Sequence, residues 1–123
     1  MTARSVRSSV SYYAGQAAEQ QVAVDYERRG FSIAHRRWSG SGGEIDLIAR
    51  NADGIVFIEV KKSASFDMAA ARISQRQMAR ICASAAQFLE NEPDGQLTNV
   101  RFDAALVDAT GAVQIIENAF GQA

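Results

Sequence analysis

Residues 43–49 (GEIDLIA) and residues 57–61 (FIEVK), separated by a turn at residues 51–54 (NADG), decide the fold of this chain. An Asp-Gly step between two alternating apolar segments is a strong short-range signal for a β-hairpin. Since side chains alternate between the two faces of a strand, one face of the hairpin is apolar and is expected to form core, with Ile45 and Leu47 on it. The polar side chains that share the other face are Glu44, Asp46, Glu59 and Lys61.

The turn allows two registers between these strands. In the first, Arg50 pairs with Ile55. Asp46 then lies opposite Glu59. In the second, the turn is a tighter two-residue loop and Asp46 lies opposite Lys61. Either register gathers three carboxylates and one ammonium group at one end of the hairpin.

The carboxylates gathered at one end of the hairpin suggest a binding site for a cation. Carboxylates a few ångströms apart repel each other by about 1 to 4 kcal/mol, depending on the local dielectric. A divalent cation removes that repulsion, and carboxylates from adjacent strands suit Mg²⁺. A lysine beside the cation can orient or deprotonate a water molecule, or offset charge on a phosphate. Together, these groups are what phosphodiester hydrolysis requires.

Composition is that of one ordinary soluble domain, with 47% hydrophobic and 22% charged residues in 123. The sequence shows neither an apolar segment of membrane-spanning length nor a signal peptide, and Cys82 is its single cysteine. We therefore expect a cytoplasmic protein without an intrachain disulfide. The formal net charge of −1 argues mildly against tight non-specific binding to nucleic acid.

The remaining elements follow from periodicity and turn signals. Residues 1–13 are expected to be a flexible lead-in to a single domain at 14–120, which starts with a helix ending at Gly30. A strand over 31–37 and a flexible, glycine-rich connection over 38–43 lead into the hairpin. A polar connection over 62–73 follows it.

The second half of the chain reads as one helix and two strands. Ser74 and Gln77 form a capping box at the helix start, in which both side chains bind free backbone amides. Cys82 lies on the apolar stripe of this helix and is expected to be buried. Strands are predicted over 100–107 and 112–116. The order α-β-β-β-α-β predicts an α/β domain with a mixed central sheet flanked by helices.

Glu19 lies at the edge of the buried stripe of the first helix, beside Val22, Ala23 and Tyr26 at helical spacing. A carboxylate there needs a partner. Either it pairs locally with an arginine, or it belongs to the acidic site of the hairpin.

These residues resemble the PD-(D/E)xK pattern of restriction-endonuclease-like nucleases, in which Asp46 is followed across a hairpin by Glu59-Val60-Lys61. The chain is most similar to the YraN-like family of small, predicted endonuclease-related bacterial proteins. Glu19 and the glycine-rich segment 39–42 are also similar to archaeal Holliday-junction resolvases. The chain departs from the family pattern at Ser63, where an arginine is common.

The resemblance implies that Asp46, Glu59 and Glu19 bind Mg²⁺ or Mn²⁺ and that Lys61 activates water or stabilises charge, so that all four are catalytic. The expected function is a Mg²⁺-dependent endonuclease acting on structured or single-strand-containing nucleic acid, with DNA as the expected partner and a homodimer as a possible assembly. The residues expected to contact nucleic acid are Arg37, Trp38, Lys62, Arg72, Arg76 and Arg80.

Two other interpretations stay open. The chain could be a non-catalytic module that keeps a nuclease fold and binds nucleic acid or recruits a partner. Alternatively, the polar hairpin face could be a solvated surface of weak ion pairs, each contributing about 0.2 to 1 kcal/mol. That interpretation suits Glu44 best. Arg101 and Asp103 alternate on one strand and are expected to form a structural ion pair outside the catalytic site.

Overall fold

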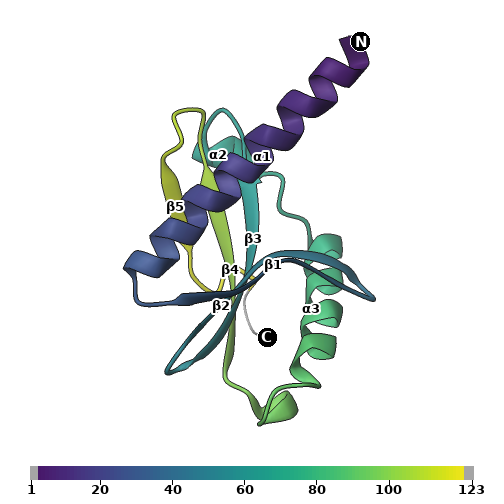
Figure 1. The fold of residues 1–123 in the computed structure, drawn as a ribbon, viewed down its shortest axis with the longest axis vertical. Helices are drawn as coiled ribbons and strands as arrows, with labels where there is room; N and C mark the ends of the chain where they lie inside the picture. Colours follow the sequence, from purple (N-terminus) through teal and green to yellow (C-terminus); the bar gives the residue numbers. More distant parts are fainter. Residues whose placement is uncertain (1–2, 121–123) are drawn as a thin grey trace.

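The computed structural model describes residues 3–120, and describes their side chains from Gly15 onward. Its centre is a mixed sheet of five strands in the order β1-β2-β3-β4-β5, with helices on both faces (Figure 1). The strands are β1 (Ser32–Gly40), β2 (Gly43–Asn51), β3 (Gly54–Lys62), β4 (Val100–Val107) and β5 (Val113–Ile116). The helices are α1 (Ala3–Arg28), α2 (Phe66–Ala70), α3 (Gln75–Leu89) and the short 3₁₀ turn η1 (Gly95–Leu97). The predicted α/β class and element order are confirmed.

The strand connections explain why the sheet is mixed. Neighbouring strands are antiparallel except β3 and β4, which run parallel. Parallel neighbours need a long crossover, and the segment that contains α2 and α3 supplies it. Arg50 pairs with Ile55, and Asn51 pairs with Gly54 across the turn. The first of the two predicted registers is therefore the one adopted.

Both faces of the sheet carry core, not one as the hairpin pattern suggested. On one face, α1 buries Val22 and Tyr26 against Leu47 and Ile58. On the other, the residues that pack around α3 include Ile45, Ile48, Phe57, Ile81 and Phe88. The prediction that Ile45 shares a face with Leu47 is wrong, because β2 stops pairing with β3 at Leu47 and follows β1 toward α3.

The segment 38–43 is not the flexible connection that its glycines suggested. Gly40 pairs with Gly43, so the segment continues β1 into a tight hairpin with β2. The hairpin tip lies against α3: the Ser84 hydroxyl donates to the Gly43 carbonyl, and a Cβ on Gly42 would meet the Arg80 carbonyl oxygen. Glycine is needed at position 42 for this close approach and not for flexibility.

Two further expectations concern the burial of Cys82 and the division of the chain into a lead-in and a domain. Cys82 is exposed, so its predicted burial is wrong; Ser84 and Phe88 occupy the buried side of α3 instead. The division into a lead-in at 1–13 and a domain at 14–120 stays a prediction, although the described backbone is already helical at Ala3. Within residues 3–120, no helix is both long and apolar enough to cross a membrane.

Candidate functional site

The candidate site lies where β2 and β3 separate. The ladder between them ends at the pair Leu47 and Ile58, although β2 begins four residues earlier at Gly43 and β3 continues to Lys62. At the same level of the neighbouring strand β1, Arg37 has a left-handed backbone conformation with φ 52°. Beyond Ile58, β3 has no ladder partner on β2, and a side chain of β2 binds the backbone of β3 instead.

Asp46 binds β3 at this fork. The amide of Val60 donates to Asp46 Oδ2 over 2.8 Å, in place of a ladder hydrogen bond. Burial, followed by the negative charge of Glu59, raises the pKa of Asp46 to about 7. The Val60 amide opposes that rise, and the charge of Glu19 adds to it. The cause is the crowding of carboxylates in a poorly solvated position, as predicted from the hairpin pattern.

Glu59 is almost fully buried, at 5% exposure, and two donors meet one of its oxygens. Lys61 Nζ lies 3.1 Å from Glu59 Oε1, and Gln77 Nε2 donates to the same oxygen over 2.6 Å. Ser74 does cap α3 by accepting from the Gln77 amide. The second half of the predicted capping box is wrong, since the Gln77 side chain binds Glu59 and not the start of the helix. The Ser-x-x-Gln pattern was the only sequence signal at Gln77, and it pointed to a local role.

Glu19 comes to the site from α1 but is paired with an arginine. Arg37 Nε donates to Glu19 Oε2 over 3.0 Å. Glu19 therefore has an arginine partner, but that partner comes from β1 and not from nearby in α1 as the local alternative supposed. The negative charge of Glu19 also contributes to the raised pKa of Asp46. Glu19 lines two pockets of about 410 Å³ each, one with Asp46 and one with Arg37. It stands between the acidic fork and the arginine.

A pocket of about 410 Å³ opens onto the fork and carries both signs of charge. Its acidic residues are Glu19 and Asp46. Its basic residues are Lys61, Lys62 and Arg72, and the Arg72 guanidinium donates to the Lys62 carbonyl. A pocket lined by both carboxylates and cations suits a phosphate group held against a metal ion.

The other predicted contact residues lie outside this pocket. Arg76 and Arg80 are exposed on α3. Trp38 is half-buried, and its ring packs edge-to-face against Phe88. Glu44 is exposed on β2, where it pairs with Ser39 of β1, and it does not line the pocket. The interpretation of this residue as part of a solvated surface anticipated that position.

The donor set fits a hard divalent cation, although its arrangement does not yet form a ligand cage. Carboxylate oxygens are the ligands that Mg²⁺ takes, and the mutual repulsion seen in the pKa of Asp46 is what a cation would relieve. Among the residues whose side chains are described, no group of three or more acidic, histidine or cysteine residues is placed to hold a metal ion.

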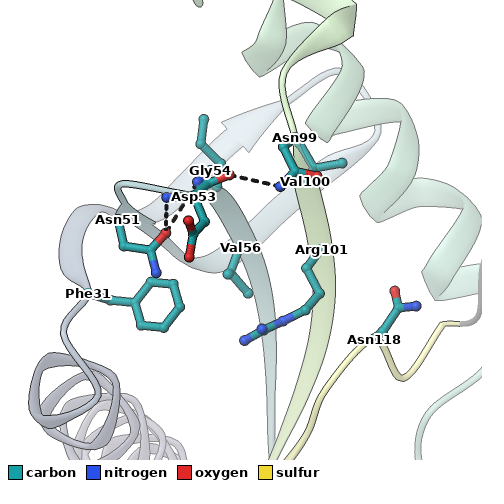
Figure 2. A pocket seen from close by; sticks show the side chains of 10 residues that line it. Phe31, Asn51, Asp53, Gly54, Val56, Asn99, Val100, Arg101 and Asn118 are labelled. Atoms are coloured by element: carbon teal, nitrogen blue, oxygen red, sulfur yellow. Dashed lines mark hydrogen bonds between the residues drawn. The ribbon is translucent and has the colours of Figure 1, made fainter.

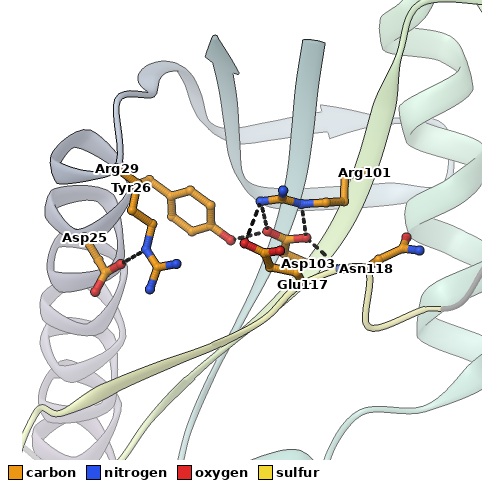
Figure 3. Close-up of polar contacts among 7 residues, drawn as sticks. All are labelled: Asp25, Tyr26, Arg29, Arg101, Asp103, Glu117 and Asn118. Carbon is orange, nitrogen blue, oxygen red and sulfur yellow. Dashed lines mark hydrogen bonds and ion pairs between the residues drawn. The ribbon is translucent and has the colours of Figure 1, made fainter. Parts of the chain in front are cut away.

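A second buried polar cluster surrounds Asp103 of β4, which pairs with Ile58 of β3 in the sheet (Figure 3). Asp103 is fully buried and accepts hydrogen bonds from the Tyr26 hydroxyl, from the Arg101 guanidinium and from the backbone N–H of Asn118. Burial and the bond to Asp103 raise the pKa of Tyr26 well above its ordinary value. The cluster ties α1, β4 and the C-terminal segment together, and the expected ion pair between Arg101 and Asp103 is present.

Figure 2 shows a pocket of about 330 Å³ on the opposite end of β3 from Lys61, lined by Phe31, Asp53, Asn99 and Arg101 among others. Its one arginine is already paired with the buried Asp103 and lies 3.8 Å from Glu117. The charge of Arg101 is thus neutralised within the protein.

Comparison with known proteins places the chain in a family. The profile of the uncharacterised protein family UPF0102 matches residues 18–107. A UPF0102 protein of Ruegeria pomeroyi is 56% identical over 121 residues, which cover 98% of each chain. Relatives from Cereibacter sphaeroides and Dinoroseobacter shibae are 63% and 41% identical, over 90% and 94% of this chain and 95% and 87% of their own length. The matched region contains Glu19, Asp46, Glu59, Lys61 and Gln77, and the chain is a member of the UPF0102 family.

Proposed function

We propose that this protein is a Mg²⁺-dependent endonuclease that hydrolyses phosphodiester bonds in structured or single-strand-containing nucleic acid, with DNA as the expected substrate. The observation that carries the proposal is the convergence of Asp46, Glu59 and Lys61 at the fork between β2 and β3, beside a pocket lined with cations. The same three residues carry the resemblance to PD-(D/E)xK nucleases.

Each acidic residue has a separate task in this proposal. Asp46 and Glu59 hold the cation, and Glu19 joins them by exchanging its contact with Arg37. A bound Mg²⁺ supplies positive charge that polarises a phosphate group. Val60 fixes the orientation of the Asp46 carboxylate, because its amide binds one carboxylate oxygen.

Lys61 is the residue that we propose acts on the reacting groups. Its ammonium is held 3.1 Å from Glu59 Oε1 and its side chain is only 12% exposed. In that position it can orient a water molecule toward phosphorus or offset the charge that grows on the phosphate oxygens. Lys62 and Arg72 line the same pocket and would bind the phosphate backbone.

The outer contacts complete the proposed substrate interface. Arg76 and Arg80 lie on the exposed side of α3, the helix that also contacts Glu59 through Gln77. Arg37 and Trp38 would contact the substrate from β1, with the Trp38 ring available only where Phe88 leaves it uncovered. We propose the cytoplasm as the compartment, and a homodimer if both strands of a junction are cut.

A cleavage assay tests the function directly. Purified protein is incubated with labelled duplex, single strand, flap, fork, four-way junction and RNA, each with EDTA, Mg²⁺ or Mn²⁺. We expect metal-dependent cleavage of at least one substrate, lowered by about a hundredfold or more in Asp46→Asn because the substitution removes a charged ligand.

The matched control is Asp67→Asn, the same substitution at an exposed position in the first turn of α2. It should cleave at the wild-type rate. Cleavage that persists unchanged in Asp46→Asn, or that ignores EDTA, would show that the activity does not come from this site.

The second candidate function is a binding module that keeps the fold without catalysis. Two observations favour it: Glu19 is paired with Arg37, and among the residues whose side chains are described no group of three or more acidic, histidine or cysteine residues is placed to hold a metal ion. This candidate predicts salt-sensitive binding to one of the same nucleic acids, equal in wild type and Glu59→Gln, with no cleavage in any metal.

A further inference from the structure

We propose that Gln77 is a positioning residue of the fork, which holds the Glu59 carboxylate in the orientation that a divalent cation requires. This inference rests on the proposed function, since it concerns the same acidic site. It assigns a role to a residue on α3 that the sequence pattern assigned to helix capping.

The hydrogen bond between Gln77 and Glu59 is short, and the chemistry of the two groups determines which of them donates. Gln77 Nε2 lies 2.6 Å from Glu59 Oε1. A carboxylate accepts hydrogen bonds and does not donate them, so the amide nitrogen and not the amide oxygen must face Glu59. Hydrogen bonds to an ionised acceptor are roughly twice as strong as neutral ones.

Two hydrogen-bond donors therefore restrict the orientation of the Glu59 carboxylate. Lys61 Nζ and Gln77 Nε2 approach the same oxygen, Oε1, from two different elements. Without Gln77, the carboxylate would be held by the flexible Lys61 side chain and by its hydrogen bond with the Asp46 side chain. The contact from α3 restricts rotation of the group, and pre-orientation of this kind is what supporting residues contribute at metal sites.

Gln77 itself is well placed to act as a rigid support. Its backbone amide is bound by the Ser74 hydroxyl at the start of α3, and its side chain is half-buried. The body of α3 is held in turn by the hairpin tip, where Ser84 binds the Gly43 carbonyl. The position of Gln77 is therefore determined by the packing of the helix and not by the Glu59 contact alone.

The test measures Mn²⁺ affinity and needs no activity. Gln77→Met keeps the length of the side chain and removes the donor. The concentration of free Mn²⁺ is followed by its electron paramagnetic resonance signal during titration of wild type, Gln77→Met and Gln75→Met. Gln75 is exposed in the first turn of the same helix, so Gln75→Met is the matched control. Thermal unfolding without metal reports any change in the fold.

We expect Gln77→Met to weaken Mn²⁺ binding by about tenfold, the lower end for loss of a supporting contact at a metal site. Gln75→Met should bind like wild type, and the metal-free melting temperatures of the three proteins should agree within a few degrees. Equal Mn²⁺ affinity in Gln77→Met and wild type would overturn this inference and leave the nuclease proposal standing. Absence of Mn²⁺ binding in wild type would overturn both. Binding by wild type without cleavage of any substrate would remove the nuclease proposal but leave the role of Gln77 to be decided by the affinities.

Discussion

The amide of Val60 donates to the Asp46 carboxylate over 2.8 Å, just beyond Leu47 and Ile58, the last residues that pair between β2 and β3. A side chain thus takes the place of a backbone acceptor, and it brings a negative charge into a poorly solvated fork. The carboxylate of Glu59 lies close enough to raise the pKa of Asp46 further. The site stores electrostatic repulsion that a cation or a proton can relieve.

That repulsion predicts how the metal-free protein responds to pH. The pKa of Asp46 is raised from 3.8 to about 7, so folding favours its protonated form. As pH rises from 4 to 7, the carboxyl ionises more readily in the unfolded chain, and the folded state loses stability. Asp46→Asn keeps an acceptor for Val60 and removes the charge. We expect it to be more stable than wild type at pH 8 by on the order of 2 kcal/mol.

The measurement is urea unfolding of both proteins at pH 4, 5, 6, 7 and 8 in EDTA. The advantage of Asp46→Asn should be smallest at pH 4 and should grow up to about pH 7. A difference that does not change with pH would mean that Asp46 is ionised in the folded protein throughout this range.

The left-handed backbone of Arg37 predicts that glycine is more stable than alanine at this position, which is unusual within a strand. Its φ of 52° is a conformation that costs a residue with a Cβ about 1 kcal/mol. Arg37→Gly and Arg37→Ala lose the same contact with Glu19, so their difference reports the backbone alone. We expect Arg37→Gly to be more stable than Arg37→Ala by about 1 kcal/mol in urea unfolding.

The neighbouring Arg36 provides the control for this comparison. It pairs with Leu47 in the sheet, where glycine is unfavourable. Arg36→Gly should therefore be less stable than Arg36→Ala. The same order at positions 36 and 37 would show that Arg37 adopts ordinary extended backbone in solution.

The buried contacts of Asp103 predict that its replacement lowers the stability of the fold and has no direct effect on the proposed cleavage reaction. Asp103→Ala leaves the Tyr26 hydroxyl, the Asn118 backbone N–H and the Arg101 guanidinium without their shared acceptor. Removing one partner of a buried charged network costs about 3 kcal/mol or more. Asp25→Ala, which breaks an exposed pair with Arg29, should cost about 0.5 kcal/mol or less. Chemical unfolding of both variants measures the difference, and equal losses would contradict the role assigned to the cluster.

Much of this architecture could be predicted from local sequence patterns. The NADG turn and the alternation on either side predicted the β2–β3 hairpin, and the turn restricted it to two registers, of which one is adopted. The strand over Val100–Val107 and the Ser74 cap of α3 were likewise predicted correctly. Each of these features depends on neighbours within a few residues, because strand alternation and helix capping are local properties of the backbone.

The predictions for segment 38–43 and for Cys82 were wrong because contacts with distant parts of the chain decide the structure there. Segment 38–43 looked flexible because it is rich in glycine, yet it is ordered by contact with Ser84 and the Arg80 carbonyl on a helix some forty residues later. Cys82 matched the apolar stripe of α3 but lies outside the part that the sheet covers. Helical periodicity identifies an apolar face but leaves open how much of that face a neighbour buries.

The sequence by itself determined the α/β class, the hairpin, and the presence of Asp46, Glu59 and Lys61 at one end of it, because these follow from period-two alternation around one turn. Tertiary structure alone decided which partners those residues have. Arg37 reaches Glu19, and Gln77 reaches Glu59, each across 18 positions of the chain. Such pairs depend on where α1 and α3 cross the sheet, and that is set by the packing of two separate cores and not by the residues near each side chain.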